Sequence, residues 1–254
     1  MAGIVHLGIV GACGKMGLEI RRLAEEDSEV SLSMLVDPSM NHEDGICKYG
    51  IYDIDPPGVV DVIVDFSTPD NALTSADWCL SHGKPLVIGT TGLDDQEHID
   101  NLKKYTGAIK ILVSPNMSLG VNLIDALLPQ IAAILQGVAV EIQEIHHDQK
   151  KDSPSGTALR FAETLVKARG GEIVYGRTKG RSDNRPINDV VVHSLRGGTV
   201  PGEHTIYFLG TDEVIKITHS ALSRKIFAMG AIRAAKWIVD QPPGFYSMNN
   251  VLGL

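Results

Sequence analysis

Short apolar runs alternate with segments of helical periodicity through the first part of the chain. After the first run, Met16, Ile20 and Leu23 recur at the spacing of an amphipathic helix. Residues 93–105 also have a helical pattern, whereas residues 39–58 have none. The runs, rich in Val, Ile and Leu as in buried parallel strands, occupy residues 4–10, 30–36, 59–66, 86–88 and 109–113. This alternation predicts an α/β domain with a parallel sheet of Rossmann type and helices on both faces.

The pattern changes after Ser114-Pro115-Asn116. A long apolar helix is expected over residues 119–135, an extended run over 138–147, and a helix over 156–169 that ends at Gly170-Gly171. Three further segments alternate with the period of two that is typical of strands, and an Ala-rich helix follows them. These are residues 189–195, 204–209, 214–220 and 225–239. The pattern predicts a second, α+β part with an antiparallel or mixed sheet.

The charge of the chain restricts its partners. Its 254 residues are 43% hydrophobic and 21% charged, an ordinary globular composition, and the formal net charge is −8. Nucleic acid and anionic membranes both require a basic face, so we expect neither as a partner. An anionic substrate would need local positive charge in its site.

Cysteine usage and the N-terminal residues indicate a cytoplasmic protein. Cys13, Cys47 and Cys79 are widely separated and form no CxxC pair, which favours reduced thiols over disulfides or a zinc site. The start of the chain lacks the features of a secretory signal. No apolar stretch is long enough to span a bilayer.

A glycine-rich turn follows the first expected strand. Gly11-Ala12-Cys13-Gly14-Lys15-Met16-Gly17 is a GxxGxxG variant of the dinucleotide fingerprint, in which glycines let the pyrophosphate approach a helix N-terminus. Asp37 ends the second expected strand, where it could bond the adenine ribose. A carboxylate there repels a 2′-phosphate, and residues 38–41 contain no Arg or Lys. We therefore expect NADH to be preferred, with NADPH possible because Lys15 could soften the repulsion.

Two more turns follow expected parallel strands, at residues 89–92 and 114–117. Ligands of open α/β sheets bind beyond the carboxyl ends of the strands. These turns would then line the nicotinamide end of the cleft, although ordinary connecting loops would have the same pattern.

The densest polar cluster spans residues 141–158. It leads from an extended run through His146, His147 and Lys150 into the Pro-Ser-Gly-Thr start of a helix. Backbone N–H groups of residues 155–157 would point outward there and could bind a carboxylate, with Lys150 adding positive charge.

Other interpretations of this cluster remain open. The two histidines could bind a metal, although no third ligand stands at a usual spacing. They could also be structural, Ser155 and Thr157 could act only as caps, and Lys151 and Asp152 could be solvated surface charges.

The sequence resembles the dihydrodipicolinate reductase family, also called 4-hydroxy-tetrahydrodipicolinate reductase. The resemblance rests on EIQEIHHxxKxDxPSGTA at 141–158, and covers essentially the whole chain. Supporting motifs are GACGKMG at 11–17, GTTG at 89–92, SPNMSLGVN at 114–122 and RGGTVPGEH at 196–204. It implies an oxidoreductase of diaminopimelate and lysine biosynthesis that reduces a cyclic dicarboxylate to tetrahydrodipicolinate, with hydride from the nicotinamide and a proton added at the neighbouring carbon.

The resemblance also implies roles for individual residues. His146 would be the general acid/base and Lys150 the proton donor. The substrate would be bound by His147, Lys150, Ser155, Gly156, Thr157 and Arg196. The cofactor would contact Gly11, Ala12, Cys13, Gly14, Lys15, Met16, Asp37, Gly89, Thr90, Thr91, Ser114, Pro115, Asn116 and Met117, and no metal is expected.

The family's architecture implies that residues 1–117 and 227–254 form the dinucleotide-binding domain. Residues 118–226 would form the inserted domain for substrate binding and tetramerisation, with hinges near 114–119 and 223–227. The mixed sheets of the family associate into a homotetramer through the strands over 189–220. Many relatives have a basic residue after the ribose-binding acid, where Pro38 stands here, and this weakens the expectation of NADPH preference.

Two other functions fit parts of the sequence. Another two-domain dehydrogenase of an amino-acid pathway would share the glycine turn, but has no reason to contain HHxxKxDxPSGTA. A non-catalytic dinucleotide sensor would need the region from Gly11 to Asp37 but not the His/Lys cluster.

Overall fold

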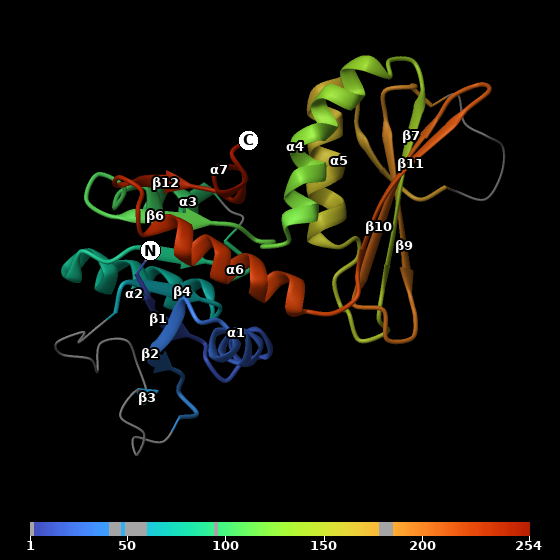
Figure 1. Cartoon of the computed structure of the whole chain (residues 1–254). Helices are drawn as coiled ribbons and strands as arrows, with labels where there is room; N and C mark the ends of the chain where they lie inside the picture. The colour runs from blue at the N-terminus through green and yellow to red at the C-terminus, as the bar shows by residue number, and fades with distance from the viewer. Residues whose placement is uncertain (1–2, 41–46, 49–59, 94–95, 178–184) are drawn as a thin grey trace. The chain divides into compact units, whose positions relative to one another are not determined.

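The computed structural model describes residues 3–40, 47–48, 60–93, 96–177 and 185–254. Contacts between residues divide the chain into two compact units. Residues 1–119 and 224–254 form one, the terminal unit, and residues 120–223 form the other, the central unit. Figure 1 shows both units with most of their helices and strands labelled.

The described part of the terminal unit contains a seven-stranded sheet in which every strand pair is parallel. The strand order is β12-β6-β5-β4-β1-β2-β3, so the order reverses beside β1, the kind of point at which open α/β sheets bind ligands. The strands are β1 (Val5–Val10), β2 (Val30–Val36), β3 (Cys47–Lys48), β4 (Val62–Asp65), β5 (Leu86–Ile88), β6 (Lys110–Val113) and β12 (Gly244–Tyr246).

Helices cover both faces of this sheet, so its strands are buried on both sides. Leu7 and Ile9 of β1 pack with α1 (Lys15–Glu26), α6 (Lys225–Ile238) and α7 (Met248–Leu252) in one apolar core. Val10 packs in a second core with α2 (Pro69–His82) and α3 (Gln96–Lys103), where Trp78 is fully buried. The fold therefore holds the carboxyl ends of the parallel strands firmly in place.

The central unit is a mixed sheet of five described strands in the order β11-β10-β7-β9-β8. Its strands are β7 (Ala139–His146), β8 (Ile173–Tyr175), β9 (Val190–Arg196), β10 (Gly202–Leu209) and β11 (Val214–Ala221). Helices α4 (Leu119–Ile134) and α5 (Gly156–Arg169) lie side by side on one face of it (Figure 1). Every second residue of β7 is buried toward these helices, from Val140 to His146.

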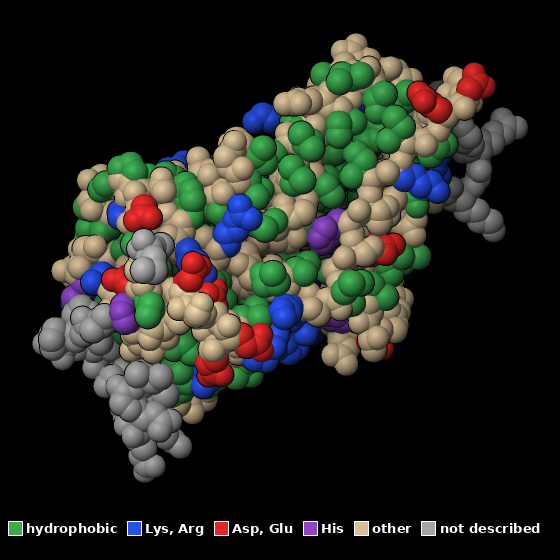
Figure 2. All heavy atoms as spheres, in the orientation of Figure 1, with side chains coloured by type: hydrophobic (Ala, Val, Ile, Leu, Met, Phe, Trp, Pro, Cys, Tyr) green, Lys and Arg blue, Asp and Glu red, His purple; other side chains and the backbone are tan. Residues whose placement is uncertain are grey.

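Helix α4 also has several large apolar side chains that are exposed. Figure 2 shows hydrophobic side chains gathered over this helix, and Leu123, Leu127 and Ile134 are 45%, 38% and 81% exposed. Exposed apolar side chains that cluster in this way are typical of surfaces that contact another part of a protein or another subunit.

The fold class predicted from the pattern is confirmed. The expected helices over 119–135 and 156–169 appear within one residue of their limits. The strand expected over 59–66 is shorter, and the helix expected over 93–105 begins only at Gln96. Most of the segment 39–58 lies outside the described residues. The pattern missed β8, β12 and α7, which are too short to show periodicity and depend on neighbours distant in the sequence.

Candidate active site

The glycine turn after β1 can be formed only without side chains at two positions. Gly11 has φ +80°, and a Cβ there would lie 2.5 Å from the Phe66 carbonyl oxygen. A Cβ on Gly17 would lie 2.2 Å from the Gly11 carbonyl oxygen. The glycines thus let α1 begin directly above the turn, and among the described residues no side chain caps its N-terminus at Gly14. This cradle fits the pyrophosphate of a dinucleotide, which helix N–H groups can bind.

Asp37 follows β2 directly and lies against this turn. Its Oδ2 accepts a hydrogen bond from the Cys13 backbone N–H at 3.0 Å, and its Oδ1 accepts from the Ser39 N–H and hydroxyl at 3.0 and 2.6 Å. Burial raises the pKa of the Asp37 carboxyl, but the hydrogen bonds from Ser39 and Cys13 outweigh it and leave the pKa below its ordinary value. The group is therefore an anion where a ribose would lie.

A buried carboxylate joins the turns after β4 and β5. Asp65 is fully buried and accepts hydrogen bonds from the hydroxyls of Ser67, Thr90 and Ser75 at 2.6, 2.8 and 2.6 Å. Gly89 lies under the Phe66 ring, where an added Cβ would clash at 2.1 Å. The structure thus brings the predicted loop at residues 89–91 to the same sheet edge as the glycine turn.

Other residues predicted to contact the cofactor differ in which of their groups are available to it. Ala12 is fully buried, and Met117 packs in the core at 1% exposure, so neither presents its side chain to a ligand. Ser114 donates its hydroxyl to the Asn116 carbonyl oxygen at 2.7 Å, and the Asn116 side chain accepts from the Ser118 N–H at 2.9 Å. This turn is shaped mainly by its own hydrogen bonds.

In the central unit, His146 stands at the end of β7 and contacts a buried carboxylate. Its Nδ1 lies 2.5 Å from Glu144 Oε2, and the two side chains are 8% and 0% exposed. Residues two apart on a strand point to the same face, which is why the strand places both on the side of α5.

Arg196 of β9 binds the same carboxylate with two nitrogens. Its Nη1 donates to Glu144 Oε2 at 2.9 Å and its Nη2 to Glu144 Oε1 at 2.8 Å. The Ser155 backbone N–H also donates to Oε1, at 3.2 Å. Burial raises the pKa of Glu144, but hydrogen bonds from His146, Arg196 and Ser194 lower it to about 2. Glu144 is thus a fully bound anion, and Arg196, predicted to bind substrate, is occupied by it.

His204 of β10 lies beside His146, with ring centroids 5.1 Å apart. Its Nε2 is 2.9 Å from the Ser155 hydroxyl, which also accepts the Ala158 N–H as the cap of α5. Burial, followed by the neighbouring His146, lowers the pKa of His204 to about 3. His204 is therefore neutral near pH 7, and the Ser155 hydroxyl faces the interior at 2% exposure.

Lys150 follows in the loop between β7 and α5. Its ammonium lies 2.8 Å from the Asp152 carboxylate, and its side chain is 22% exposed. His147 is tied to the neighbouring loop by its N–H, which donates to the Val200 carbonyl oxygen at 2.8 Å. At the start of α5, Gly156 is exposed, and a Cβ there would meet no described atom within 4 Å. The predicted histidines, the lysine and the helix start are thus brought together.

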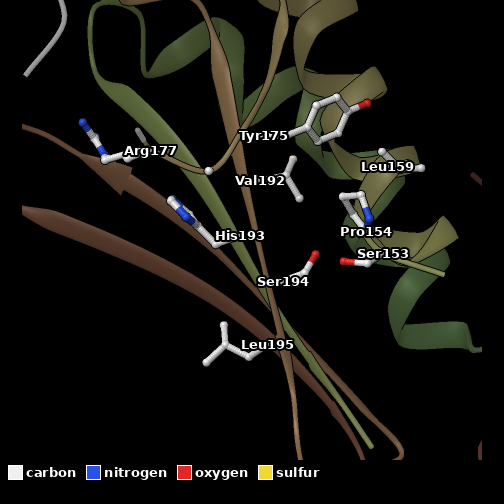
Figure 3. A pocket seen from close by; sticks show the side chains of 10 residues that line it. Ser153, Pro154, Leu159, Tyr175, Arg177, Val192, His193, Ser194 and Leu195 are labelled. Atoms are coloured by element: carbon white, nitrogen blue, oxygen red, sulfur yellow. The ribbon is translucent and has the colours of Figure 1, made fainter. Parts of the chain in front are cut away.

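A pocket of about 790 Å³ lies beside β9 (Figure 3). It is lined by Ser153, Pro154, Tyr175, Val192, Ser194 and others, and touches the predicted cluster only at Ser153 and Pro154. His146 and Lys150 do not line it. The pocket of this unit therefore does not coincide with the predicted catalytic residues.

The described residues show neither a metal-binding cluster nor a membrane-spanning helix. They contain no group of three or more His, Cys, Asp or Glu side chains placed to hold a metal ion. Nor do they include a helix with the length and apolar character that crossing a membrane requires.

Glu144, His204 and Asp65 had no predicted role in the site. Glu144 and His204 both lie within the quoted motifs, so their positions were visible in the sequence. Their pairing was not, because Arg196 is 52 residues from Glu144 and His204 is 49 residues from Ser155.

Comparison with known proteins gives consistent matches along the chain. Family models described as dihydrodipicolinate reductase, N-terminus and C-terminus, match residues 5–117 and 120–252. The 4-hydroxy-tetrahydrodipicolinate reductase of Campylobacter lari is 38% identical, over 99% of this chain and 100% of that protein. That of Lawsonia intracellularis is 39% identical, over 96% and 98%.

A solved structure agrees in fold. The dipicolinate-bound dihydrodipicolinate reductase from Paenisporosarcina sp. TG-14 superposes with a TM-score of 0.80, at 22% identity over 96% of this chain and 97% of that one.

Proposed function

The chain belongs to the dihydrodipicolinate reductase family, and from this premise we propose how its residues divide the work of the reaction. The enzyme reduces 4-hydroxy-tetrahydrodipicolinate to tetrahydrodipicolinate in diaminopimelate and lysine biosynthesis, using a nicotinamide dinucleotide. When bound, the reduced nicotinamide supplies the hydride.

We propose that His146 is the general acid/base and that Lys150 donates the proton to the carbon next to the one that receives hydride. The observation that carries this proposal is the contact between His146 and Glu144, because the carboxylate orients the imidazole. Lys150 follows four residues later, in the loop after β7. Groups in such positions exchange protons efficiently with a reacting substrate.

The dicarboxylate is bound, in this proposal, by His147, Lys150 and the backbone of Gly156 and Thr157. Ser155, also predicted to bind it, already donates its N–H to Glu144 and supports the site from below. The N-terminus of α5 supports this binding, because the helix dipole and outward N–H groups attract carboxylates. Arg196 acts on the substrate only through Glu144, since its guanidinium already holds that carboxylate.

The cofactor is held by the turn from Gly11 to Met16, by Asp37, and by the turns at 89–91 and 114–117. We propose that NADH is preferred and NADPH is accepted. The anionic Asp37 beside the glycine turn disfavours a 2′-phosphate, and Pro38 and Ser39 supply no positive charge.

We propose that the enzyme is a homotetramer that acts in the cytoplasm. The face of the mixed sheet opposite α4 and α5 has no covering element among the described residues, and Leu195 on it is 43% exposed. The segments 114–119 and 223–227 serve as hinges, because hydride transfer requires the cofactor ring to reach the substrate.

A coupled assay tests this function. The substrate is generated in place by dihydrodipicolinate synthase, and consumption of NADH or NADPH is followed by absorbance. We expect turnover with both cofactors and a higher kcat/KM with NADH. Binding of NADH without any oxidation would instead indicate a dinucleotide sensor.

A further inference from the structure

We infer that Glu144 is a positioning residue that leaves Nε2 as the one atom through which His146 exchanges its proton, and that residue 202 is glycine to keep that atom accessible. This inference rests on the proposed role of His146. It adds two residues to the machinery, one on each side of the imidazole ring.

The Glu144 carboxylate fixes the tautomer of His146. Glu144 accepts at both oxygens, from His146 and Arg196 at Oε2 and from Arg196 and Ser155 at Oε1. An ionised carboxylate can only accept hydrogen bonds, so His146 Nδ1 must carry a hydrogen in both the neutral and the charged ring. The proton that comes and goes is then on Nε2.

The space around His146 Nε2 depends on the residue at position 202. A Cβ added to Gly202 would lie 2.9 Å from His146 Nε2 and 3.3 Å from its Cδ2. Gly202 is a β10 residue without positive φ, so its backbone conformation does not require glycine. The ring cannot easily turn aside, because Glu144 holds its other nitrogen. A side chain at position 202 would therefore cover the exchanging atom.

Titratable and charged groups from three strands and a loop surround the His146 ring. Glu144 faces it from β7, Arg196 from β9 and His204 from β10, while Lys150 and Asp152 belong to the adjoining loop. His204 is neutral, and the charges of Arg196 and Lys150 are each paired with a carboxylate. Glu144 is thus the anion in direct contact that stabilises the charged imidazole.

The test uses Glu144→Gln in the full enzyme, with Glu141→Gln as its matched control. Glu141 lies on the same strand, faces the opposite side of the sheet and pairs with His193 and Arg177. We expect Glu144→Gln to lower kcat about 10²-fold, because the imidazole loses the carboxylate that orients it.

Nitrogen NMR of labelled histidine gives a readout that a merely structural role would not change. In the wild type, neutral His146 should be protonated at Nδ1, and Glu144→Gln should lose this fixed tautomer while Glu141→Gln keeps it. A Glu144→Gln enzyme with wild-type kcat and tautomer would overturn the inference.

Gly202→Ala tests the other side of the ring and does not depend on the folding of Glu144→Gln. We expect kcat to fall at least tenfold while the Kd for NADH stays within twofold. Gly197→Ala is the control, since a Cβ there meets no described atom within 4 Å. Wild-type kcat in Gly202→Ala would contradict the inference.

His146→Asn separates this inference from the proposed function. If that variant keeps its turnover, the role of His146 itself is wrong. If it is inactive while both Glu144→Gln and Gly202→Ala behave as wild type, only the positioning is wrong.

Discussion

The Asp37 carboxylate accepts the backbone N–H of Cys13 at 3.0 Å, which ties the end of β2 to the glycine turn after β1. The contact fixes a negative charge beside the cradle for the pyrophosphate. It also leaves Asp37 able to accept further hydrogen bonds, because a carboxylate oxygen has more than one lone pair.

Replacing Asp37 with Asn should raise the ratio of kcat/KM for NADPH to that for NADH by roughly tenfold. The amide can still accept the Cys13 N–H but no longer repels a 2′-phosphate. Steady-state kinetics with both cofactors on the same preparation check this, and any general loss of folded enzyme cancels in the ratio. An unchanged ratio would mean that Asp37 does not distinguish the 2′-hydroxyl of NADH from the 2′-phosphate of NADPH.

Lys150→Ala should lower kcat by about 10² to 10⁴ while NADH binding, followed by fluorescence titration, survives. The ammonium is in the central unit, whereas the predicted cofactor residues belong to the terminal unit. Lys151→Ala, at an exposed neighbour, should retain most of the activity. Equal losses of turnover and NADH affinity in Lys150→Ala would contradict the assignment of functions to the two units.

Gly17→Ala should destabilise the protein by about 2–3 kcal/mol, because the new Cβ meets the Gly11 carbonyl oxygen at 2.2 Å and the Ala12 Cα at 2.7 Å. Backbone atoms cannot move aside cheaply. Thermal unfolding should show a Tm several degrees lower, whereas Gly107→Ala, with no described atom within 4 Å of its Cβ, should unfold near the wild-type temperature. Equal Tm values for the two variants would contradict the claim that the turn has no room for a side chain at position 17.

Stability should fall as the pH is lowered from about 6.5 toward 3, in part because of His204. The unfolded chain takes up a proton at the ordinary histidine pKa, but the folded protein resists protonation of His204 down to about pH 3. Between pH 6.5 and 5 this one group weakens folding by about 2 kcal/mol. Urea unfolding at pH 7 and 5 should therefore show a smaller difference for His204→Gln than for the wild type; equal differences would argue against a neutral buried His204.

The proposed tetramer predicts a particle of four 27.4 kDa subunits in sedimentation. Leu195→Glu should reduce that mass, because it places a charge on the uncovered face of the mixed sheet. Leu18→Glu, at a 52% exposed position of α1, should leave the mass unchanged. A wild-type enzyme that sediments as a monomer at micromolar concentration would rule out the proposal.

Local chemistry made much of the fold predictable. The alternation of apolar runs and helical periods determined the parallel sheet, and the glycines and proline marked where helices begin and end. Helix α5 appears over the predicted residues because its cap, its apolar face and its terminal glycine all lie within one short segment. The resemblance through residues 141–158 depended on that same continuity.

The sequence by itself determined the order of the elements, the glycine turn and the family, because each is written in residues close together along the chain. Only the tertiary structure decided which charges meet. Glu144 finds Arg196 across 52 residues, and His146 acquires His204 as a neighbour from β10. Such pairs depend on strand register, and a shift by one residue would turn every side chain to the other face of the sheet.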